Sequence, residues 1–273
     1  MENGTISYIQ SLREDLGIFR VTPDGGVPDF KAGQFLTLGL PLESKIVNRA
    51  YSIASSPDNK KFFEFVIRWV RRPLPGRLTS LLFNAKVGDK ISWAKPAGNL
   101  TINDTLPSGE KDTRRIVCIG GGTGLAPFVS FAQHLHDTND KREVVVLHGA
   151  SYVDELSYKQ LLTDLENDSI DKGKDKWNFK YRAAISRPEE WTNRAWNGHK
   201  GRIEQFLRSN DAGKSPLEEL VGEKITKDNT MFYVCGWQGT IDGTMDYLKN
   251  KNFVTEKNKR DDGSYEVKFE SYG

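Results

Sequence analysis

Two patterns of secondary structure follow one another along this chain, and they meet near residue 106. In the first hundred residues, short stretches rich in aromatic and β-branched residues are divided by glycine and proline; they include residues 33–40, 62–70 and 90–93. Stretches of this kind predict an antiparallel β-barrel of the Greek-key type. One helix is expected to interrupt the barrel, beginning near Thr79.

The second pattern is an alternation of strands and helices. A strand at 115–119 is followed by a glycine loop, a helix at 126–136 and a strand at 144–148. This order predicts a parallel sheet with crossover helices, an α/β nucleotide-binding domain. With a polar, turn-rich linker after residue 105, the 273 residues are expected to divide into a barrel domain at 1–108 and an α/β domain at 109–273.

Composition excludes several classes of function. Lys and Arg total 39 against 37 Asp and Glu, a balance that speaks against general nucleic-acid binding. No apolar run approaches the ~18 residues of a membrane span and no signal peptide is evident, so a soluble cytoplasmic protein is expected, with a removed organellar presequence left open. Two cysteines are too few for an iron–sulfur cluster, and His134 and His136 point different ways on their helix, so no metal site is expected.

The segment 49–57 carries an arginine, an aromatic ring and a hydroxyl at a spacing that can hold a flavin at three points. On an extended strand, Arg49 and Tyr51 share one face. The guanidinium can pair with a pyrophosphate, the phenol ring can lie on an isoalloxazine, and Ser52 can bond the reactive ring nitrogen. The alternative is a surface arginine beside a half-buried tyrosine.

A second anion site is predicted where the helix of the barrel domain begins, at Gly76-Arg77-Leu78-Thr79. The first turn of a helix presents free backbone N–H groups, here including that of Leu78, and these can hold a pyrophosphate. Alternatively, Thr79 caps the helix and no ligand binds there.

Two further motifs lie where strands of the predicted parallel sheet end. The glycines of segment 119–127 let a phosphate or a ring approach the main chain closely. Their spacing is neither the common dinucleotide fingerprint, since position 125 is Leu, nor a P-loop. The apolar strand at 231–234 ends in Cys235-Gly236, at the sheet edge where open α/β folds bind ligands. The alternative for Cys235 is a buried core thiol.

Together these segments make the chain resemble the ferredoxin–NADP⁺ reductase family, most closely its plant-type group. The resemblance runs from about residue 30 to the C-terminus and rests on four motifs: Arg49-x-Tyr51-Ser52, Gly76-x-x-Thr79, Gly122-Thr123-Gly124-Leu125-Ala126-Pro127 and Cys235-Gly236. It implies an FAD-binding barrel and an NADP-binding α/β domain, with the flavin and the nicotinamide meeting between them.

The resemblance also implies a role for each matching residue of the barrel. Arg49 and the start of the helix after Gly76 would hold the FAD pyrophosphate. Tyr51 would stack on the flavin, and Ser52 would face its N5. The main chain would meet the pyrimidine edge of the ring at Val66, Ile67 and Arg68.

At the nicotinamide, the resemblance implies that Thr123 and Cys235 flank the ring close to the hydride path, with Cys235 shaping the site and forming no covalent intermediate. The chain ends with a Glu-Ser-Tyr-Gly sequence, similar to the terminal Glu-x-Tyr of plant-type enzymes. Tyr272 would cover the other flavin face, and Glu270 would take part in proton exchange near N5. Gly273 is one residue more than the family pattern.

Two arginines indicate which nicotinamide dinucleotide binds. NAD enzymes usually place a carboxylate at the end of the second parallel strand, and here none stands there before Asp154. Ser186-Arg187 follows the next apolar strand, and Arg202 comes after a further loop. Both arginines match family positions that bind a 2′-phosphate, which implies NADPH. Alternatively, these arginines are exposed salt-bridge partners. The loop from Trp191 to Trp196 departs from the plant pattern.

The activity implied by the resemblance is hydride transfer between NADPH and FAD, and transfer of single electrons between FAD and ferredoxin or flavodoxin. The basic residues Arg68, Arg71, Arg72 and Arg77 are predicted to dock this acidic carrier. Two alternatives stay open. One is an NAD(P)H-dependent flavin reductase that feeds an oxygenase or another electron acceptor, and the other is a non-enzymatic flavin or nucleotide sensor.

Overall fold

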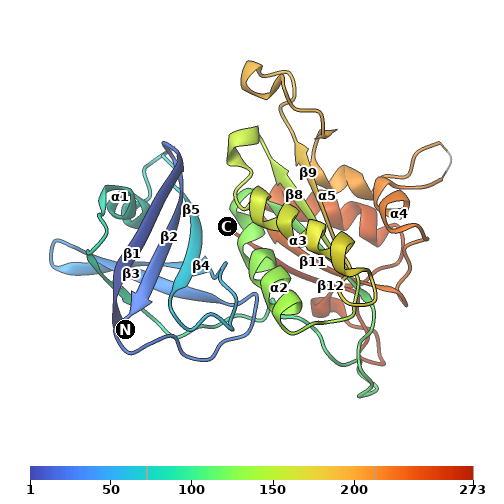
Figure 1. Ribbon diagram of the computed structural model, residues 1–273, viewed down its shortest axis with the longest axis horizontal. Coiled ribbons are helices and arrows are strands. Elements are labelled where there is room, and N and C mark those ends of the chain that lie inside the picture. The colour runs from blue at the N-terminus through green and yellow to red at the C-terminus, as the bar shows by residue number, and fades with distance from the viewer. Residues whose placement is uncertain (72, 212, 273) are drawn as a thin grey trace. The chain divides into compact units, whose positions relative to one another are not determined.

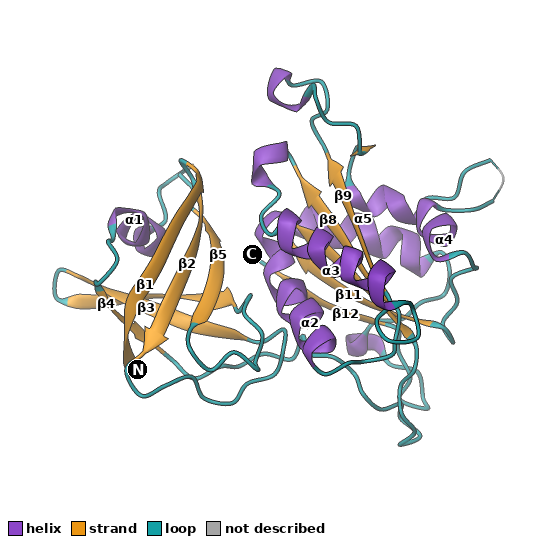
Figure 2. Ribbon diagram, in the orientation of Figure 1, coloured by secondary structure: helices purple, strands orange, loops and turns teal. Residues whose placement is uncertain are grey.

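The computed structural model describes residues 1–71, 73–211 and 213–272, and the chain divides into two compact units. The first unit contains Met1–Thr101 and Ala126–Thr138, and the second contains Ile102–Leu125 and Asn139–Gly273. Strands dominate the first unit, whereas strands and helices alternate along most of the second (Figure 1, Figure 2). Within the described residues, no helix is both long and apolar enough to cross a membrane.

The first unit is built on a six-stranded sheet in the order β4-β3-β6-β1-β2-β5, and every pairing in it is antiparallel. The outer strands β4 and β5, which are not hydrogen-bonded neighbours in the sheet, also contact each other, so the sheet curves round toward a barrel. Its strands are β1 Glu2–Arg13, β2 Leu16–Pro23, β3 Phe35–Leu42, β4 Lys45–Ser52, β5 Phe63–Arg68 and β6 Lys90–Trp93. The antiparallel barrel predicted from the sequence is therefore confirmed.

Helix α1, Arg77–Asn84, interrupts the strands of this unit two residues before the predicted start. Leu78 and Leu82 lie four residues apart, so they share one helix face, and both are buried in the core of the barrel. The barrel core itself is formed by large side chains such as Phe63 and Trp93, which have no exposed surface. Packing of this face fixes where the helix begins relative to β3 and β4, which it contacts.

Helix α2, Ala126–Asp137, is tied to the segment that follows β4. The hydroxyl of Ser130 donates to the carbonyl of Ser55 at 2.8 Å, and the amide of Gln133 donates to the carbonyl of Ala54 at 2.9 Å. On the exposed side of α2, His134 Nδ1 lies 2.7 Å from a carboxylate oxygen of Asp58. These contacts hold the helix that follows the glycine loop.

We expect the His134–Asp58 contact to weaken in acid. The hydrogen bond with His134 lowers the pKa of Asp58 and outweighs the effect of burial. A carboxyl group whose pKa falls on folding stabilises the native state above its unfolded pKa, about 3.9, and this contribution is lost as the pH falls through the lower folded value. Thermal unfolding of the wild type and of Asp58→Asn should therefore differ at neutral pH and converge near pH ~2. If the two proteins still differed in thermal stability at this low pH, the difference would not come from the ionised carboxylate.

The second unit is built on a six-stranded parallel sheet in the order β10-β9-β8-β7-β11-β12. Helix α3 lies on one face of this sheet, and α4 and α5 lie on the other (Figure 1). The strands are β7 Arg115–Gly121, β8 Val144–Ala150, β9 Phe179–Ile185, β10 His199–Lys200, β11 Thr230–Gly236 and β12 Val267–Ser271. The helices are α3 Lys159–Lys172, α4 Pro216–Val221 and α5 Gln238–Lys249, with 3-10 turns at Gly122–Leu125 (η1), Val153–Glu155 (η2), Trp191–Asn193 (η3), Ile203–Leu207 (η4) and Glu256–Asn258 (η5). The predicted parallel sheet is confirmed.

The central strands of the second unit are mostly apolar because both of their faces are covered. Every residue of β7 and of β11 is buried, and so is every residue of β8 except Gly149. In a parallel sheet all strands end at the same edge, so the residues that follow β7, β8, β9 and β11 are gathered there. The motifs found in the sequence occupy these positions.

Candidate active site

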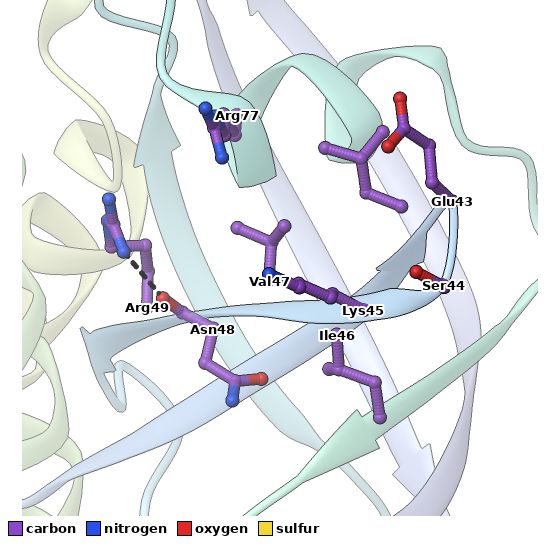
Figure 3. Close-up of a pocket in the computed structure, with 9 residues that line it drawn as sticks. Glu43, Ser44, Lys45, Ile46, Val47, Asn48, Arg49 and Arg77 are labelled. Atoms are coloured by element: carbon purple, nitrogen blue, oxygen red, sulfur yellow. Dashed lines mark hydrogen bonds between the residues drawn. The ribbon is translucent and has the colours of Figure 1, made fainter.

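Two arginines from separate elements line one groove of the first unit. The groove has a volume of about 640 Å³ and follows β4 from the hairpin turn at Glu43 to Arg49. Val47 and Arg49 point toward the side on which Arg77 lies, whereas Asn48 points away from it (Figure 3). The groove therefore combines the arginine predicted to hold a pyrophosphate with a second guanidinium from the start of α1.

The start of α1 adds backbone donors to this groove. Gly76 is the N-cap residue, no side chain caps the helix, and its first turn contains no acidic residue. The hydroxyl of Thr79 donates to the carbonyl of Gly76 at 3.0 Å, so the alternative that Thr79 caps the helix is wrong. A Cβ at position 76 would lie 2.5 Å from Thr79 Oγ1, so glycine at this position lets the main chain lie close to the Thr79 side chain. The positive end of the helix therefore has no side-chain cap and no nearby acid in its first turn, which suits an anion.

Tyr51 supplies an unpaired polar atom on the same strand. Its hydroxyl is buried without a hydrogen-bond partner in the part of the chain that the structure describes, and burial raises the pKa of this phenol. Leaving such an atom unsatisfied is costly, so its surroundings fit a bound group with polar atoms. Ser52 is the last residue of β4, lies opposite Phe35 in the neighbouring strand, and is buried. Together with the groove, these features fit the phosphates and ring of a flavin dinucleotide.

The residues expected along the pyrimidine edge lie on β5, an edge strand of the sheet. Val66 and Ile67 are buried, and Arg68 forms an ion pair with Asp15 at 2.9 Å. An edge strand has one side of its backbone that no neighbouring strand uses, so hydrogen bonds from the main chain to a ligand are possible there. Leu78, also expected at the cofactor, has its side chain in the barrel core, so only its backbone N–H can contribute.

The basic cluster of the first unit is partly neutralised. Arg68 and Arg71 pair with Asp15 and Glu14, next to the turn between β1 and β2, and Arg71 also stacks on Trp69 at 4.2 Å. Arg77 lines the groove, and Arg72 lies outside the described residues. The cluster is therefore less cationic than the sequence alone suggests.

In the second unit, the glycine loop packs against the end of β11. A Cβ at Gly124 would lie 2.3 Å from the carbonyl oxygen of Cys235, so only glycine allows the two backbones to lie this close. Gly122 has a left-handed φ of +57°, and a Cβ there would meet nothing within 4 Å. Gly122 and Thr123 are half-buried. The loop therefore has one side packed on Cys235 and Gly236 and another side open for a ligand.

Cys235, predicted at the nicotinamide, lies beside two residues predicted at the flavin, Glu270 and Tyr272. Glu270 on β12 lies opposite Cys235 in the sheet, and the N–H of Tyr272 donates to the carbonyl of Gly236 at 3.0 Å. Burial raises the pKa of the Cys235 thiol well above its ordinary range, although a hydrogen bond with the Tyr272 side chain acts in the opposite direction. Burial also raises the pKa of Glu270. A neutral thiol is a poor nucleophile, whereas a carboxyl with a raised pKa can hold a proton.

The expected 2′-phosphate residues follow two neighbouring strands. Lys200 of β10 lies opposite Ile185 of β9, so Ser186-Arg187 and Arg202 leave the same edge of the sheet. Arg187 is exposed and donates to the Tyr152 hydroxyl at 2.8 Å. Arg202 donates to the carbonyl of Gly239 at 2.9 Å and is paired with Glu204. Arg187 thus keeps a neutral partner, whereas the charge of Arg202 is shared with a carboxylate.

Neutral residues follow the end of β8, before the carboxylates of Asp154 and Glu155. Ser151 and Tyr152 follow the strand, and the nearest buried carboxylate, Glu155, accepts the backbone N–H of Ser151 at 3.1 Å. Because the Glu155 carboxylate bonds the main chain, its role is to hold the loop after β8. The position where NAD enzymes usually place their acidic residue is thus occupied by neutral groups.

Sequence reasoning missed three contributors to these sites. Arg77 belongs to the predicted anion motif, but its side chain was assigned only to the cluster predicted to dock a carrier. Tyr152 was not connected with Arg187, and the buried amide of Asn193 gave no local signal. Tyr152 could have been found because it lies two residues after a strand that ends at the carboxyl edge. Among the described residues, no group of three or more His, Cys, Asp or Glu side chains could hold a metal ion.

Comparison with known proteins identifies both units. The family model of the oxidoreductase FAD-binding domain matches residues 4–102, and that of the oxidoreductase NAD-binding domain matches residues 118–246. The ferredoxin–NADP reductase of Azotobacter vinelandii is 30% identical over 238 residues, which cover 86% of this chain and 84% of the relative. The reductase component of propane 2-monooxygenase from Mycolicibacterium goodii is 30% identical over 245 residues, which cover 88% of this chain but 61% of that relative.

A solved structure supports the fold over the whole chain. The crystal structure of a ferredoxin NADP⁺ reductase from Neisseria gonorrhoeae with bound FAD and NADP matches with a TM-score of 0.77 at 22% identity, covering 98% of this chain and 97% of that one. At this level of identity the match carries the fold and leaves the assignment of individual residues to the geometry described above.

Proposed function

This chain belongs to the ferredoxin–NADP reductase family, and from that membership we propose that it oxidises NADPH through bound FAD and passes the electrons singly to an acidic carrier, ferredoxin or flavodoxin. It is a flavin-dependent oxidoreductase whose two units match FAD-binding and NAD-binding domains. The assignment of NADPH, of the carrier and of the individual site residues is the proposal. The cytoplasmic location expected from the sequence stays a prediction.

One observation carries the choice of NADPH. Arg187 and Arg202 leave the same sheet edge, while the end of β8 presents Ser151 and Tyr152 instead of a carboxylate. Guanidinium groups recognise a phosphate through charge-assisted hydrogen bonds, whereas a carboxylate at the end of β8 would favour ribose hydroxyls and repel the phosphate. The second unit therefore supports a nucleotide that carries a 2′-phosphate.

In the first unit, Arg49, Arg77 and the first-turn N–H groups of α1 would hold the pyrophosphate of FAD. Tyr51 would place its ring against the isoalloxazine, and Ser52 would bond the ring edge. When bound, FAD accepts a hydride from NADPH and gives up electrons one at a time, so the protein contributes position and electrostatics.

In the second unit, Gly124 lets the glycine loop pack directly on the end of β11 at Cys235. Thr123 and Cys235 would then lie on either side of a slot for the nicotinamide ring. The thiol of Cys235 stays protonated, so it would shape the slot without forming a bond to the substrate. Glu270 lies beside it, and its raised pKa suits it to hold a proton close to the reacting ring.

An absorption spectrum of the purified protein, titrated anaerobically first with NADH and then with NADPH, tests the proposal. We expect flavin absorbance in the visible range, and bleaching at lower concentrations of NADPH than of NADH. A protein that remained colourless after incubation with FAD would overturn the flavin assignment. Preferential bleaching by NADH would overturn the choice of NADPH and favour the alternative of a reductase that feeds an oxygenase, a class to which one of the relatives belongs by name.

The contact between Tyr272 and Cys235 gives a second prediction. Cys118 and Cys235 are both fully buried, and burial raises the pKa of both thiols. We expect neither to be alkylated by iodoacetamide in the native protein. Removal of the Tyr272 side chain in Tyr272→Ala should speed alkylation of Cys235 by about tenfold or more, with Cys118 in the middle of β7 as the internal control. Mass spectrometry of the labelled peptides would measure both; equal rates in the two proteins would contradict a covering role for Tyr272.

The acidic carrier gives a third prediction. If Arg71 and the neighbouring arginines attract such a carrier, reduction of added ferredoxin should slow as salt rises, because the screening length falls from ~10 Å at 0.1 M to ~3 Å at 1 M. Since Glu14 already pairs with Arg71, Glu14→Gln should raise the rate at low salt, while Glu110→Gln, on the loop before β7, should not. A rate independent of salt would reject electrostatic docking.

A further inference from the structure

The buried amide of Asn193 joins two loops that leave the carboxyl edge of the parallel sheet. Asn193 is 1% exposed and closes the short helix η3. Its side-chain oxygen accepts the N–H of Val153 at 2.9 Å, and its side-chain nitrogen donates to the carbonyls of Ser151 at 3.0 Å and Arg187 at 2.7 Å. One side chain therefore fixes the loop after β8 and the loop after β9 to each other.

The joined loops carry the pair that faces outward at this edge. The Arg187 guanidinium lies 5.4 Å from the centre of the Tyr152 ring and donates to its hydroxyl at 2.8 Å. Tyr152 stands between Ser151 and Val153, the two residues that Asn193 bonds, and the carbonyl of Arg187 itself is the third partner. The amide thus holds the backbone on both sides of the Tyr152–Arg187 pair, and the N–H of Ser186 adds a bond to the carbonyl of Ala150 at 2.9 Å where the two loops begin.

We infer that Asn193 is a positioning residue for selectivity between NADPH and NADH, acting through Arg187. This inference rests on the proposed function, because it assigns Arg187 to the 2′-phosphate. A long exposed side chain loses conformational entropy when it is fixed on a phosphate, and a fixed backbone below it reduces that loss. Without the amide, the two loops lose three of the hydrogen bonds that hold them, Arg187 samples more conformations, and the phosphate is held less often.

The test compares ligands that differ only in the 2′-phosphate. Binding of 2′,5′-ADP and of 5′-AMP is measured by calorimetry on the FAD-loaded protein, together with kcat and KM for NADPH and NADH. In Asn193→Ala we expect the preference for 2′,5′-ADP over 5′-AMP to fall about tenfold. The loss should appear in KM for NADPH, while kcat is much less affected, because the reacting ring is remote from these loops along the nucleotide.

A matched control separates positioning from general loss of stability. Ser169 is buried to a similar extent and bonds the opposite end of β9, since its hydroxyl donates to the carbonyl of Trp177 and accepts the N–H of Phe179. Ser169→Ala should lower the midpoint of thermal unfolding without changing the preference for the 2′-phosphate. If Asn193→Ala does not fold, Asn193→Asp, which keeps the side-chain size and the acceptor for Val153, takes its place.

A double-mutant cycle shows whether Asn193 acts through Arg187. In an Arg187→Ala background, the further substitution Asn193→Ala should change the ligand preference less than twofold, because the group that it positions is gone. Additive losses, or an unchanged preference in Asn193→Ala, would overturn the inference. A wild type that binds 2′,5′-ADP no better than 5′-AMP would instead overturn the proposed NADPH specificity, so the two failures are distinguishable.

Discussion

Replacing Gly124 with alanine should reduce kcat/KM for NADPH by about a hundredfold while leaving FAD bound. The added methyl group would lie 2.3 Å from the carbonyl oxygen of Cys235 and 2.7 Å from the Cα of Gly236. Ordinary contacts of this kind exceed 3.4 Å, so a backbone segment has to move by roughly an ångström. Displacements of about 1 Å near a reacting centre cost on the order of a hundredfold in rate.

A matched substitution elsewhere in the same unit controls for backbone strain. Gly173 ends α3 with a left-handed φ of +83°, and a Cβ there would meet nothing within 4 Å. Gly173→Ala should cost about 1–2 kcal/mol of stability, because an L-residue is strained at this φ, and should leave kcat/KM for NADPH unchanged. Flavin absorbance and steady-state kinetics measure both proteins. If Gly124→Ala kept its activity within about threefold of the wild type, the close approach of the loop to Cys235 would not be required.

The fold was largely predictable because its signals are local. The strand-to-helix alternation after residue 106 predicts the parallel sheet, and the central strands are largely apolar because both faces are buried. Arg49, Tyr51 and Ser52 lie on one strand, so their grouping also follows from sequence spacing alone. The positions of motifs within single elements are therefore well predicted.

Pairings between distant segments were not predictable from spacing. The register between β2 and β5 places Leu16 opposite Arg68, which brings Asp15 and Glu14 close to the basic cluster and neutralises two of its members. Likewise, the groove of the first unit unites Arg49 with Arg77 only because α1 packs beside β4. Such contacts depend on the whole topology of the barrel, about which a single sequence motif carries no information.

The amide of Asn193 illustrates a further limit. Asparagine in a loop is ordinary and usually exposed, and its burial follows from three backbone partners that belong to two different loops. The same is true of Glu155, a buried carboxylate after β8 that accepts the N–H of Ser151. Carboxylates near a strand end are informative only once their backbone partners are known.

The two arginines expected at the 2′-phosphate should contribute unequally to the preference for NADPH. Each charge-assisted hydrogen bond is worth ~1.5–3 kcal/mol, so removing both in Arg187→Ala/Arg202→Ala should lower kcat/KM for NADPH by about a hundredfold or more and leave NADH oxidation nearly unchanged. Arg187 bonds the neutral hydroxyl of Tyr152, whereas Arg202 already shares its charge with Glu204. Arg187→Ala alone should therefore cause the larger part of the loss.

Two further variants make this expectation specific. Glu204→Gln removes the competing carboxylate and should strengthen binding of 2′,5′-ADP, because Arg202 then directs its full charge to the phosphate. Arg208→Ala removes an exposed arginine that follows η4 and should leave the ratio of kcat/KM for NADPH to that for NADH within about twofold of the wild type. Equal losses from Arg187→Ala and Arg208→Ala would contradict this expectation. They would mean that only the net charge of the protein matters, whereas a phosphate held at the sheet edge requires an arginine at that particular position.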